Sequence, residues 1–123
     1  MPDSIAIIGA STDRSKYGNK AVRAWRQQGW TVYPIHPAAQ EVEGLKAYPS
    51  VGEVPYPIDK ASFYVPPQIG LKAIEGVAEK GIKEVYLNPG AESEDLVARC
   101  YALGVTPIVA CSILAVGAHP AEF

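Results

Sequence analysis

A chain of 123 residues, 48% of them hydrophobic, has the size and composition of a single globular domain, which we expect to span residues 1–123. Its net charge of −2 excludes a broad basic surface for nucleic acid or an anionic membrane. Two cysteines, Cys100 and Cys111, are too few for a disulfide scaffold, and their spacing matches no zinc motif. No apolar run approaches the roughly 20 residues of a transmembrane helix, and the N-terminus lacks a basic leader, so we expect a cytoplasmic protein.

Strand and helix signals alternate along the first third of the chain. The first strand is expected at residues 5–8 and the first helix at 19–28. Trp25 lies on the apolar face of that helix, and Gly29 is placed to end it. A second strand, closed by two prolines, is expected at 30–35.

The middle of the chain begins with a loop-like stretch over 36–59, which holds one short strand near 45–48. A third strand is expected at 60–65, where two consecutive prolines stop it. Apolar residues then recur at helical spacing over 68–80, and Gly81 ends this second helix.

The last third repeats the alternation. A fourth strand is expected at 83–90, and Ser93 is a typical N-cap for a third helix with acidic residues in its first turn. Gly104 ends that helix, and a fifth strand is expected at 105–113.

Five strands separated by helices predict an α/β fold, a Rossmann-like doubly wound parallel five-stranded sheet with helices on both faces. Counted along the chain, the expected strand order is 3-2-1-4-5, which reverses between strands one and four. Ligands of such sheets bind outside the carboxyl ends of the strands, so the loops after the strands should hold the site.

The loop after the first strand has the chemistry of an anion site. Gly9 permits a sharp turn and keeps side chains away from a ligand. Residues after it can direct backbone N–H groups at an anion, aided by the positive end of the following helix. Ser11 and Thr12 add hydroxyls, and Arg14 and Lys16 add positive charge.

Two common nucleotide motifs are absent from this loop. The dinucleotide fingerprint requires glycines where Ser11 and Arg14 stand, and an acidic residue after the second strand, where the chain reads Pro34-Ile35-His36-Pro37. The phosphate-binding sequence G-x-x-x-x-G-K-[ST] is also missing.

The stretches "IAIIGAST", "VYPIHP", "GLKAYPSVGEVP", "FYVPP" and "LNPGAESEDL" together resemble the small stand-alone CoA-binding domain proteins. Those proteins are similar to the N-terminal CoA-binding domain of the succinyl-CoA synthetase α subunit. The resemblance covers nearly the whole chain and implies coenzyme A or an acyl-CoA as the ligand. The residues that it implies in binding are Gly9, Ala10, Ser11, Thr12, Arg14, Lys16, Pro34, Ile35, His36, Pro37, Tyr64, Val65, Pro66, Pro67, Leu87, Asn88, Pro89 and Gly90.

The resemblance also implies a role for each segment. Residues 9–14 would hold the CoA phosphates, and 34–37 would border the adenosine. Residues 64–67 would form a wall beside the adenine or the pantetheine, and 87–90 would meet the pantetheine arm. Consecutive prolines agree with such a wall, because they make a stiff apolar ledge without competing N–H groups.

One departure concerns charge. Ala38 and Ala39 stand where family members often carry a basic residue, and Lys46, Arg14 or Lys16 are the candidates to replace it.

Four residues carry thiol or imidazole side chains. Cys100 is expected in the core, and Cys111 is expected as a buried small residue unless it is a reactive thiol that pairs with CoA. His36 is either a contact for adenine or ribose or an ordinary loop histidine, and His119 is expected at the surface. No catalytic triad, carboxylate pair or metal-ligand cluster is recognisable, so no catalytic and no metal-binding residue is predicted.

We therefore expect a binding module for CoA or acyl-CoA, a sensor or carrier without chemistry of its own. Alternatives are an NAD(P)-binding oxidoreductase fragment, a subunit that completes an acyl-CoA synthetase or acyltransferase in trans, and redox control through Cys111. The candidate protein partners are a second copy of the chain and an acyl-CoA enzyme, and no nucleic acid or membrane partner is expected.

Overall fold

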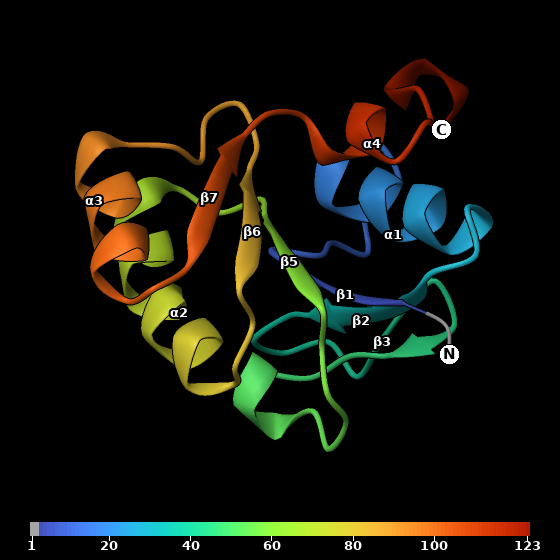
Figure 1. Cartoon of the computed structure of the whole chain (residues 1–123). Helices are drawn as coiled ribbons and strands as arrows, with labels where there is room; N and C mark the ends of the chain where they lie inside the picture. The colour runs from blue at the N-terminus through green and yellow to red at the C-terminus, as the bar shows by residue number, and fades with distance from the viewer. Residues whose placement is uncertain (1–2) are drawn as a thin grey trace.

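The computed structural model describes residues 3–123, which form a five-stranded parallel sheet, a two-stranded hairpin and helices on both faces of the larger sheet (Figure 1). The elements in chain order are β1 (Ser4–Ile8), α1 (Tyr17–Gln27), β2 (Thr31–Ile35), β3 (Glu41–Val42), β4 (Leu45–Lys46), η1 (Val51–Glu53), β5 (Lys60–Phe63), α2 (Pro67–Glu79), β6 (Glu84–Leu87), α3 (Glu94–Ala102), β7 (Thr106–Val109), α4 (Ser112–Ala115) and η2 (Pro120–Glu122).

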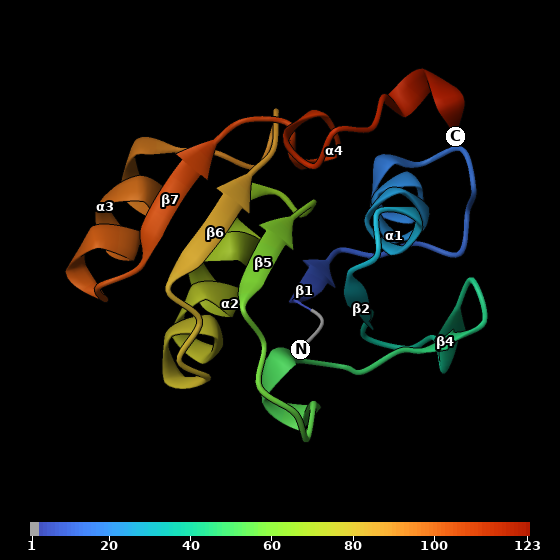
Figure 2. The same ribbon diagram turned by 45° about the vertical axis from the view of Figure 1, so that its right-hand side comes forward.

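The helices lie in two layers, with α1 against α4 on one face of the sheet and α2 against α3 on the other (Figures 1 and 2). Side chains of β1 alternate between the faces, as a strand requires. Ile5 and Ile7 belong to the core on the α1 side, whereas Ala6 and Ile8 belong to the core under α2 and α3. The predicted α/β class and the two-sided arrangement of helices are confirmed.

The predicted strand order is wrong in one respect. The sheet runs β2-β1-β5-β6-β7, so the third long strand lies between the first and the fourth instead of outside the second. Counted by long strands the order is 2-1-3-4-5, and it reverses between β1 and β5.

The chain between β2 and β5 explains this order. Tyr48 forms a parallel bridge with Ile35, and its amide donates to the carbonyl of Pro34 at 3.0 Å. The amide of His36 donates to the carbonyl of Tyr48 at 2.9 Å. These bonds occupy the carboxyl end of the outer edge of β2, on the side where the sequence predicts the third strand, and β5 pairs instead with the free edge of β1. Ahead of Tyr48 the chain folds into the β3–β4 hairpin, of which only the second strand was expected.

Helix boundaries follow the sequence signals. The hydroxyl of Ser93 accepts a hydrogen bond from the amide of Leu96 at 3.1 Å and caps α3 as predicted. Gly29, Gly81 and Gly104 follow their helices with positive φ angles, which permits the left-handed turn that ends each helix.

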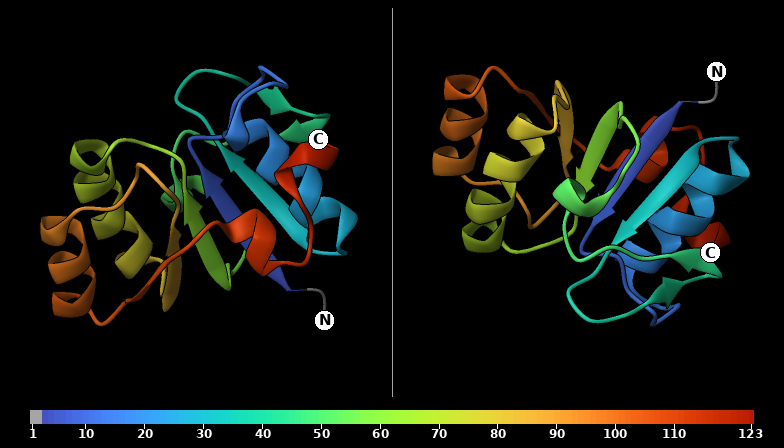
Figure 3. Two further views of the ribbon diagram at one scale, coloured as in Figure 1. Left: turned by 90° about the horizontal axis from the view of Figure 1, so that it is seen from above. Right: turned by 90° about the horizontal axis from the view of Figure 1, so that it is seen from below.

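The predicted fifth strand over 105–113 is too long. β7 ends at Val109, and Ser112 begins the short helix α4. The amide of Ser112 donates to the Asn88 Oδ1 atom at 2.8 Å, a side-chain bond in place of a ladder bond. The chain therefore leaves the sheet, and seen from above it continues through α4 and η2 across α1 (Figure 3). Within residues 3–123, every helix is too short or too polar to cross a membrane.

Candidate functional site

A cavity of about 730 Å³ lies at the carboxyl ends of β1, β5, β6 and β7 and is called here the central cavity. Figure 2 shows the arrowheads of β5, β6 and β7 pointing to this side of the sheet, where α4 lies. The residues that line it are Gly9, Ser11, Lys16, Tyr17, Gly18, Tyr64, Val65, Pro66, Asn88, Pro89, Gly90, Ala91, Cys111, Leu114 and Pro120. Three of the four segments predicted to bind CoA therefore meet in one place.

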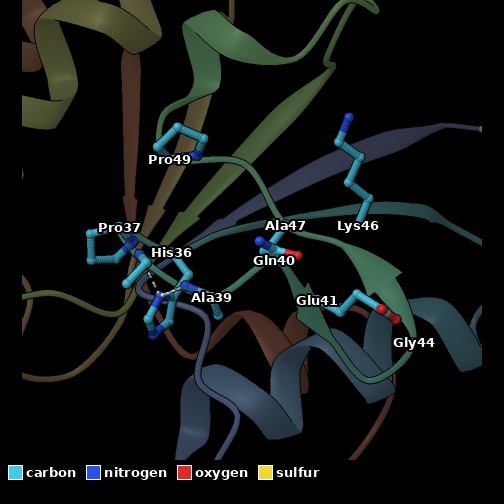
Figure 4. A pocket seen from close by; sticks show the side chains of 10 residues that line it. His36, Pro37, Ala39, Gln40, Glu41, Gly44, Lys46, Ala47 and Pro49 are labelled. Atoms are coloured by element: carbon cyan, nitrogen blue, oxygen red, sulfur yellow. Dashed lines mark hydrogen bonds between the residues drawn. The ribbon is translucent and has the colours of Figure 1, made fainter.

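The fourth segment lies in a second cavity of about 630 Å³ between the end of β2 and the β3–β4 hairpin, called here the edge cavity (Figure 4). Its lining residues are His36, Pro37, Ala38, Ala39, Gln40, Glu41, Gly44, Lys46, Ala47 and Pro49. The His36 Nδ1 atom accepts hydrogen bonds from the amides of Ala38 and Ala39 at 3.0 and 2.8 Å. This fixes the imidazole and leaves Nε2 as the nitrogen available to a ligand.

The loop between β1 and α1 adjoins the central cavity and is held by two close backbone contacts. Gly9 has a φ of 91°, and a Cβ atom there would lie 2.6 Å from the carbonyl oxygen of Tyr64. A Cβ atom on Gly18 would lie 2.2 Å from the carbonyl oxygen of Gly9. Only glycine at both positions lets the start of α1 approach the end of β1 and the segment after β5 so closely.

Backbone amides at the start of α1 border the central cavity and are candidate donors to an anion. Tyr17 and Gly18 are the first two residues of the helix, where N–H groups have no intrahelical acceptor, and no side chain caps them. Of the described residues that line the central cavity, Lys16 is the one with a charged side chain. An anion there would meet helix amides, the helix dipole and an ammonium group together.

The amides of Gly9 and Ala10 do not belong to this anion site. Both donate to the carbonyl of Ile35, at 3.3 and 3.2 Å, and so join β1 to β2. Gly9 and Ala10 are therefore not available as amide donors to a phosphate, whereas the roles of Ser11 and Thr12 stay predictions.

Asn19 is a residue of this loop that the sequence reasoning missed. Its buried amide nitrogen donates to the carbonyl of Ser11 at 2.9 Å and to the Glu43 carboxylate at 3.0 Å. The guanidinium of Arg14 lies 3.7 Å from the same carboxylate. The hydrogen bond from Asn19, assisted by the charge of Arg14, lowers the pKa of Glu43. Arg14 is therefore directed at the hairpin, and its predicted role at a phosphate finds no support in this geometry.

The remaining predicted residues lie outside both cavities. The side chains of Ala10, Ile35 and Leu87 are buried in the core, so at these positions only the backbone could face a ligand. Thr12 is exposed. The others that line neither cavity are Pro34 and Pro67.

Several lining residues were not predicted, although Ala91 lies in the stretch LNPGAESEDL that carries the family resemblance. In the central cavity these are Tyr17, Gly18, Ala91, Leu114 and Pro120. Leu114 and Pro120 reach it because α4 and η2 fold back over α1. No sequence signal indicated that the C-terminal segment folds back over α1.

The two cysteines have different surroundings. Cys100 is fully buried in the core as expected, and burial raises the pKa of its thiol. Cys111 is half-buried and lines the central cavity, so the prediction of a buried residue is only partly met. Within residues 3–123, histidine, cysteine and acidic side chains form no group of three that could hold a metal ion.

Tyr64 is the lining residue whose ionisation is most altered. Burial raises the pKa of its phenol to about 12, against the opposing effect of the Ser112 and Ser62 hydroxyls. The phenol therefore stays protonated at neutral pH.

We predict that Tyr64 makes the folded chain lose stability at high pH. Between about pH 10 and pH 12 the unfolded chain releases the phenol proton while the folded chain keeps it, so unfolding becomes easier as the pH rises. The loss should approach about 2–3 kcal/mol at pH 12. Urea unfolding of the wild type and of Tyr64→Phe over this range measures it, and equal pH dependence of the two proteins would contradict the prediction.

The family of the chain is shown by comparison with known proteins. A family model described as CoA binding domain matches residues 3–117. The alpha subunit of ADP-forming acetate–CoA ligase II from Pyrococcus furiosus is 39% identical over 87 residues, which are 70% of this chain and 19% of that subunit. ADP-forming acetate–CoA ligase II from Archaeoglobus fulgidus is 35% identical over 96 residues, which are 76% of this chain and 14% of the ligase. The chain thus spans a fifth or less of these two relatives.

Solved structures agree with the sequence comparison. A conserved hypothetical protein from Pyrococcus furiosus superposes with a TM-score of 0.83 at 35% identity, over 92% of this chain and 98% of that one. The dinucleotide-forming acetyl-coenzyme A synthetase 1 from Ca. Korarchaeum cryptofilum, in complex with phosphate and ADP, gives a TM-score of 0.78 at 35% identity, over 89% of this chain and 26% of that one. The resemblance to CoA-binding domains predicted from the five short stretches is confirmed, and the chain belongs to the CoA-binding domain family.

Proposed function

We propose that the chain binds coenzyme A or an acyl-CoA across the two cavities, with the diphosphate at the start of α1. The observation that carries this proposal is that the uncapped start of α1 and the ammonium group of Lys16 border the central cavity in a chain of the CoA-binding family. Both cavities have volumes in the usual range for small-molecule sites, roughly 300–1,000 Å³.

The two cavities suit the two ends of the cofactor. The edge cavity offers the fixed imidazole of His36, the flat surface of Pro37 and the ammonium group of Lys46 to a base and a ribose phosphate. Lys46 thereby occupies the same cavity as Ala38 and Ala39 and could supply the positive charge that those positions lack.

The central cavity suits the pantetheine arm. Its walls are mostly apolar and come from the Tyr64–Pro66 segment, the Pro89–Gly90 turn and Leu114. An elongated chain with amide groups can lie along such walls and exchange a few hydrogen bonds. Cys111 and Pro120 would lie near its thiol or acyl end.

We infer a sensor or carrier without catalysis of its own. The high pKa of Tyr64 makes it a poor acid or base near neutral pH, because general acid–base catalysis works best with a pKa near the operating pH. The other ionisable residues that line the central cavity are Lys16, Tyr17 and Cys111. We assign Lys16 to the phosphates.

Isothermal titration calorimetry tests the proposal. CoA and acetyl-CoA should give saturable heat at concentrations up to about 1 mM, whereas NADH should not compete, because the dinucleotide fingerprint is absent. Absence of heat with both thiol cofactors, or tighter binding of NADH, would reject the proposal.

Comparing the CoA affinities of two lysine variants tests the proposed phosphate position. Lys16→Met should weaken CoA binding about three- to tenfold, since it removes a charged donor from the phosphates. Lys72→Met changes an exposed lysine on α2 that lines neither cavity, and should bind like the wild type. Equal affinities of the two variants would argue against a phosphate beside Lys16.

A second candidate function is that of a subunit that completes an acyl-CoA synthetase in trans. The match to the alpha subunit of an acetate–CoA ligase favours it. Adding the chain to a separately prepared ATP-dependent synthetase module would then raise acetyl-CoA formation, and no increase would favour the sensor or carrier.

A further inference from the structure

Beneath the central cavity lies a buried network of hydrogen bonds that joins β5, β6, α1 and α4. Ser62, Asn88 and Ser112 are its buried members, exposed by 0%, 2% and 0%. The Asn88 amide nitrogen donates to the Ser62 Oγ atom and to the Phe63 carbonyl, each at 2.8 Å. Every buried polar side-chain atom of the described residues has a partner, so the protons of this network can be assigned by counting donors and acceptors.

The count is most restrictive at the Ser112 hydroxyl, which has three partners. The Trp25 Nε1 atom, which can only donate, lies 3.3 Å from the Ser112 oxygen. The Ser62 hydroxyl, which already accepts from Asn88, donates to the same oxygen at 2.8 Å. These two bonds occupy both lone pairs of the Ser112 oxygen.

The third partner, the Tyr64 hydroxyl oxygen at 3.0 Å, must therefore receive the proton of Ser112. The opposite direction would give the Ser112 oxygen three donors and leave its own proton unpaired in a buried site, which is costly. Among residues 3–123, Ser112 is the side chain that lies at hydrogen-bond distance and angle from the Tyr64 phenol oxygen. The phenol proton is thus left for a ligand.

We propose that Tyr64 is a hydrogen-bond donor to the central cavity and binds a carbonyl oxygen of the pantetheine–acyl part of CoA. This inference rests on the proposed function. Tyr64 lines the cavity beside Val65 and Pro66, where an apolar arm would run. Because Ser112 already fixes the phenol, little further rotational freedom of this side chain would be lost when a ligand binds.

The ionisation of the phenol is consistent with a donor role. Burial raises the pKa of Tyr64 to about 12, so the proton is retained throughout the neutral range. A neutral phenol can pair with a carbonyl oxygen and has no charge to repel the phosphates nearby.

The carbonyl has two possible sources in one cofactor, and ligand choice separates them. Both CoA and acetyl-CoA carry pantetheine amide carbonyls, acetyl-CoA adds a thioester carbonyl, and ADP carries neither. Tyr64→Phe should weaken binding of the carbonyl-containing ligands about three- to tenfold, the value of one net hydrogen bond, and leave ADP affinity unchanged. Tyr33→Phe, which removes a phenol oxygen outside both linings, should match the wild type.

Each outcome has a stated meaning. An equal loss for CoA and acetyl-CoA assigns the amide carbonyl, and a loss for acetyl-CoA alone assigns the thioester; both support the proposal. Unchanged affinities, or an equal loss for ADP, would overturn it while leaving CoA binding intact. Failure of the wild type to bind CoA would instead overturn the proposed function and this inference with it.

Infrared spectroscopy of the wild type tests the same proposal and does not depend on whether the Tyr64→Phe variant folds. Acetyl-CoA labelled with ¹³C at one carbonyl at a time should show a lowered stretching frequency for at least one labelled carbonyl on binding, because hydrogen bonding weakens the C=O bond. If every labelled carbonyl keeps the frequency of an unbonded group, the proposal is wrong.

Discussion

Replacing Gly18 by alanine should destabilise the chain and abolish measurable CoA binding. The new Cβ atom would lie 2.2 Å from the carbonyl oxygen of Gly9, and that oxygen belongs to backbone that cannot turn aside like a flexible side chain. Relief requires α1 to move away from the end of β1, which separates the helix amides from the loop. We expect the free energy of unfolding to fall by about 1–3 kcal/mol, as for other overpacked sites. Urea unfolding and calorimetry with CoA measure the two effects.

Gly76 offers a matched control, because it also lies inside a helix. A Cβ atom there would meet its nearest neighbour, the Val51 side chain, at 3.8 Å, an ordinary contact. Gly76→Ala should bind CoA like the wild type and be more stable by about 0.5–1 kcal/mol, because alanine is the better helix former. If Gly18→Ala were as stable and bound CoA as well as Gly76→Ala, the close approach of Gly18 to the Gly9 carbonyl would be unnecessary for folding and binding.

Asn88→Ala should have the second large effect, a loss of about 2–4 kcal/mol in the free energy of unfolding. The Asn88 side chain donates to Ser62 and Phe63 and accepts from the amide of Ser112, and it is almost fully buried. Its removal leaves several buried polar groups without partners, each at a cost of about 1–3 kcal/mol if water does not enter. Because Ser112 orients Tyr64, CoA binding should weaken as well.

An exposed amide provides the comparison for this variant. Gln27 lies at the surface near the end of α1, and Gln27→Ala should change stability by no more than about 0.5 kcal/mol. Urea unfolding of both variants measures the difference. A loss for Asn88→Ala as small as that for Gln27→Ala would show that the buried network does not stabilise the loop ends.

The parts of the fold that were predictable from sequence depend on local signals. Ser93 caps α3 through its own hydroxyl, and Gly29 and Gly81 adopt the positive φ that ends a helix, so neighbouring residues suffice to recognise them. The apolar runs of the strands are similarly local. Each long strand was found within a few residues of its true bounds.

The misplaced features depend on contacts between distant segments. The strand order was wrong because Tyr48 pairs with the edge of β2, and nothing in the local sequence indicates that pairing. The end of the last strand was misjudged because the amide of Ser112 bonds to Asn88, which lies 24 residues earlier.

The candidate site shows the same division. The segments at Gly9, Tyr64 and Asn88 were predicted because loops after parallel strands gather at one edge of a sheet. The Ile35 carbonyl accepts from two amides of the first loop and so decides which amides remain free. The orientation of Arg14 depends on Glu43, whose carboxylate also accepts a hydrogen bond from Asn19. Such bonds become visible only once the fold is known.

A crystal structure of the chain with bound CoA tests the central claim most directly. We predict that the CoA diphosphate lies within hydrogen-bond distance, about 2.7–3.2 Å, of the amides of Tyr17 and Gly18 and beside the ammonium group of Lys16. A diphosphate located elsewhere on the molecule, with the start of α1 unoccupied, would contradict the account.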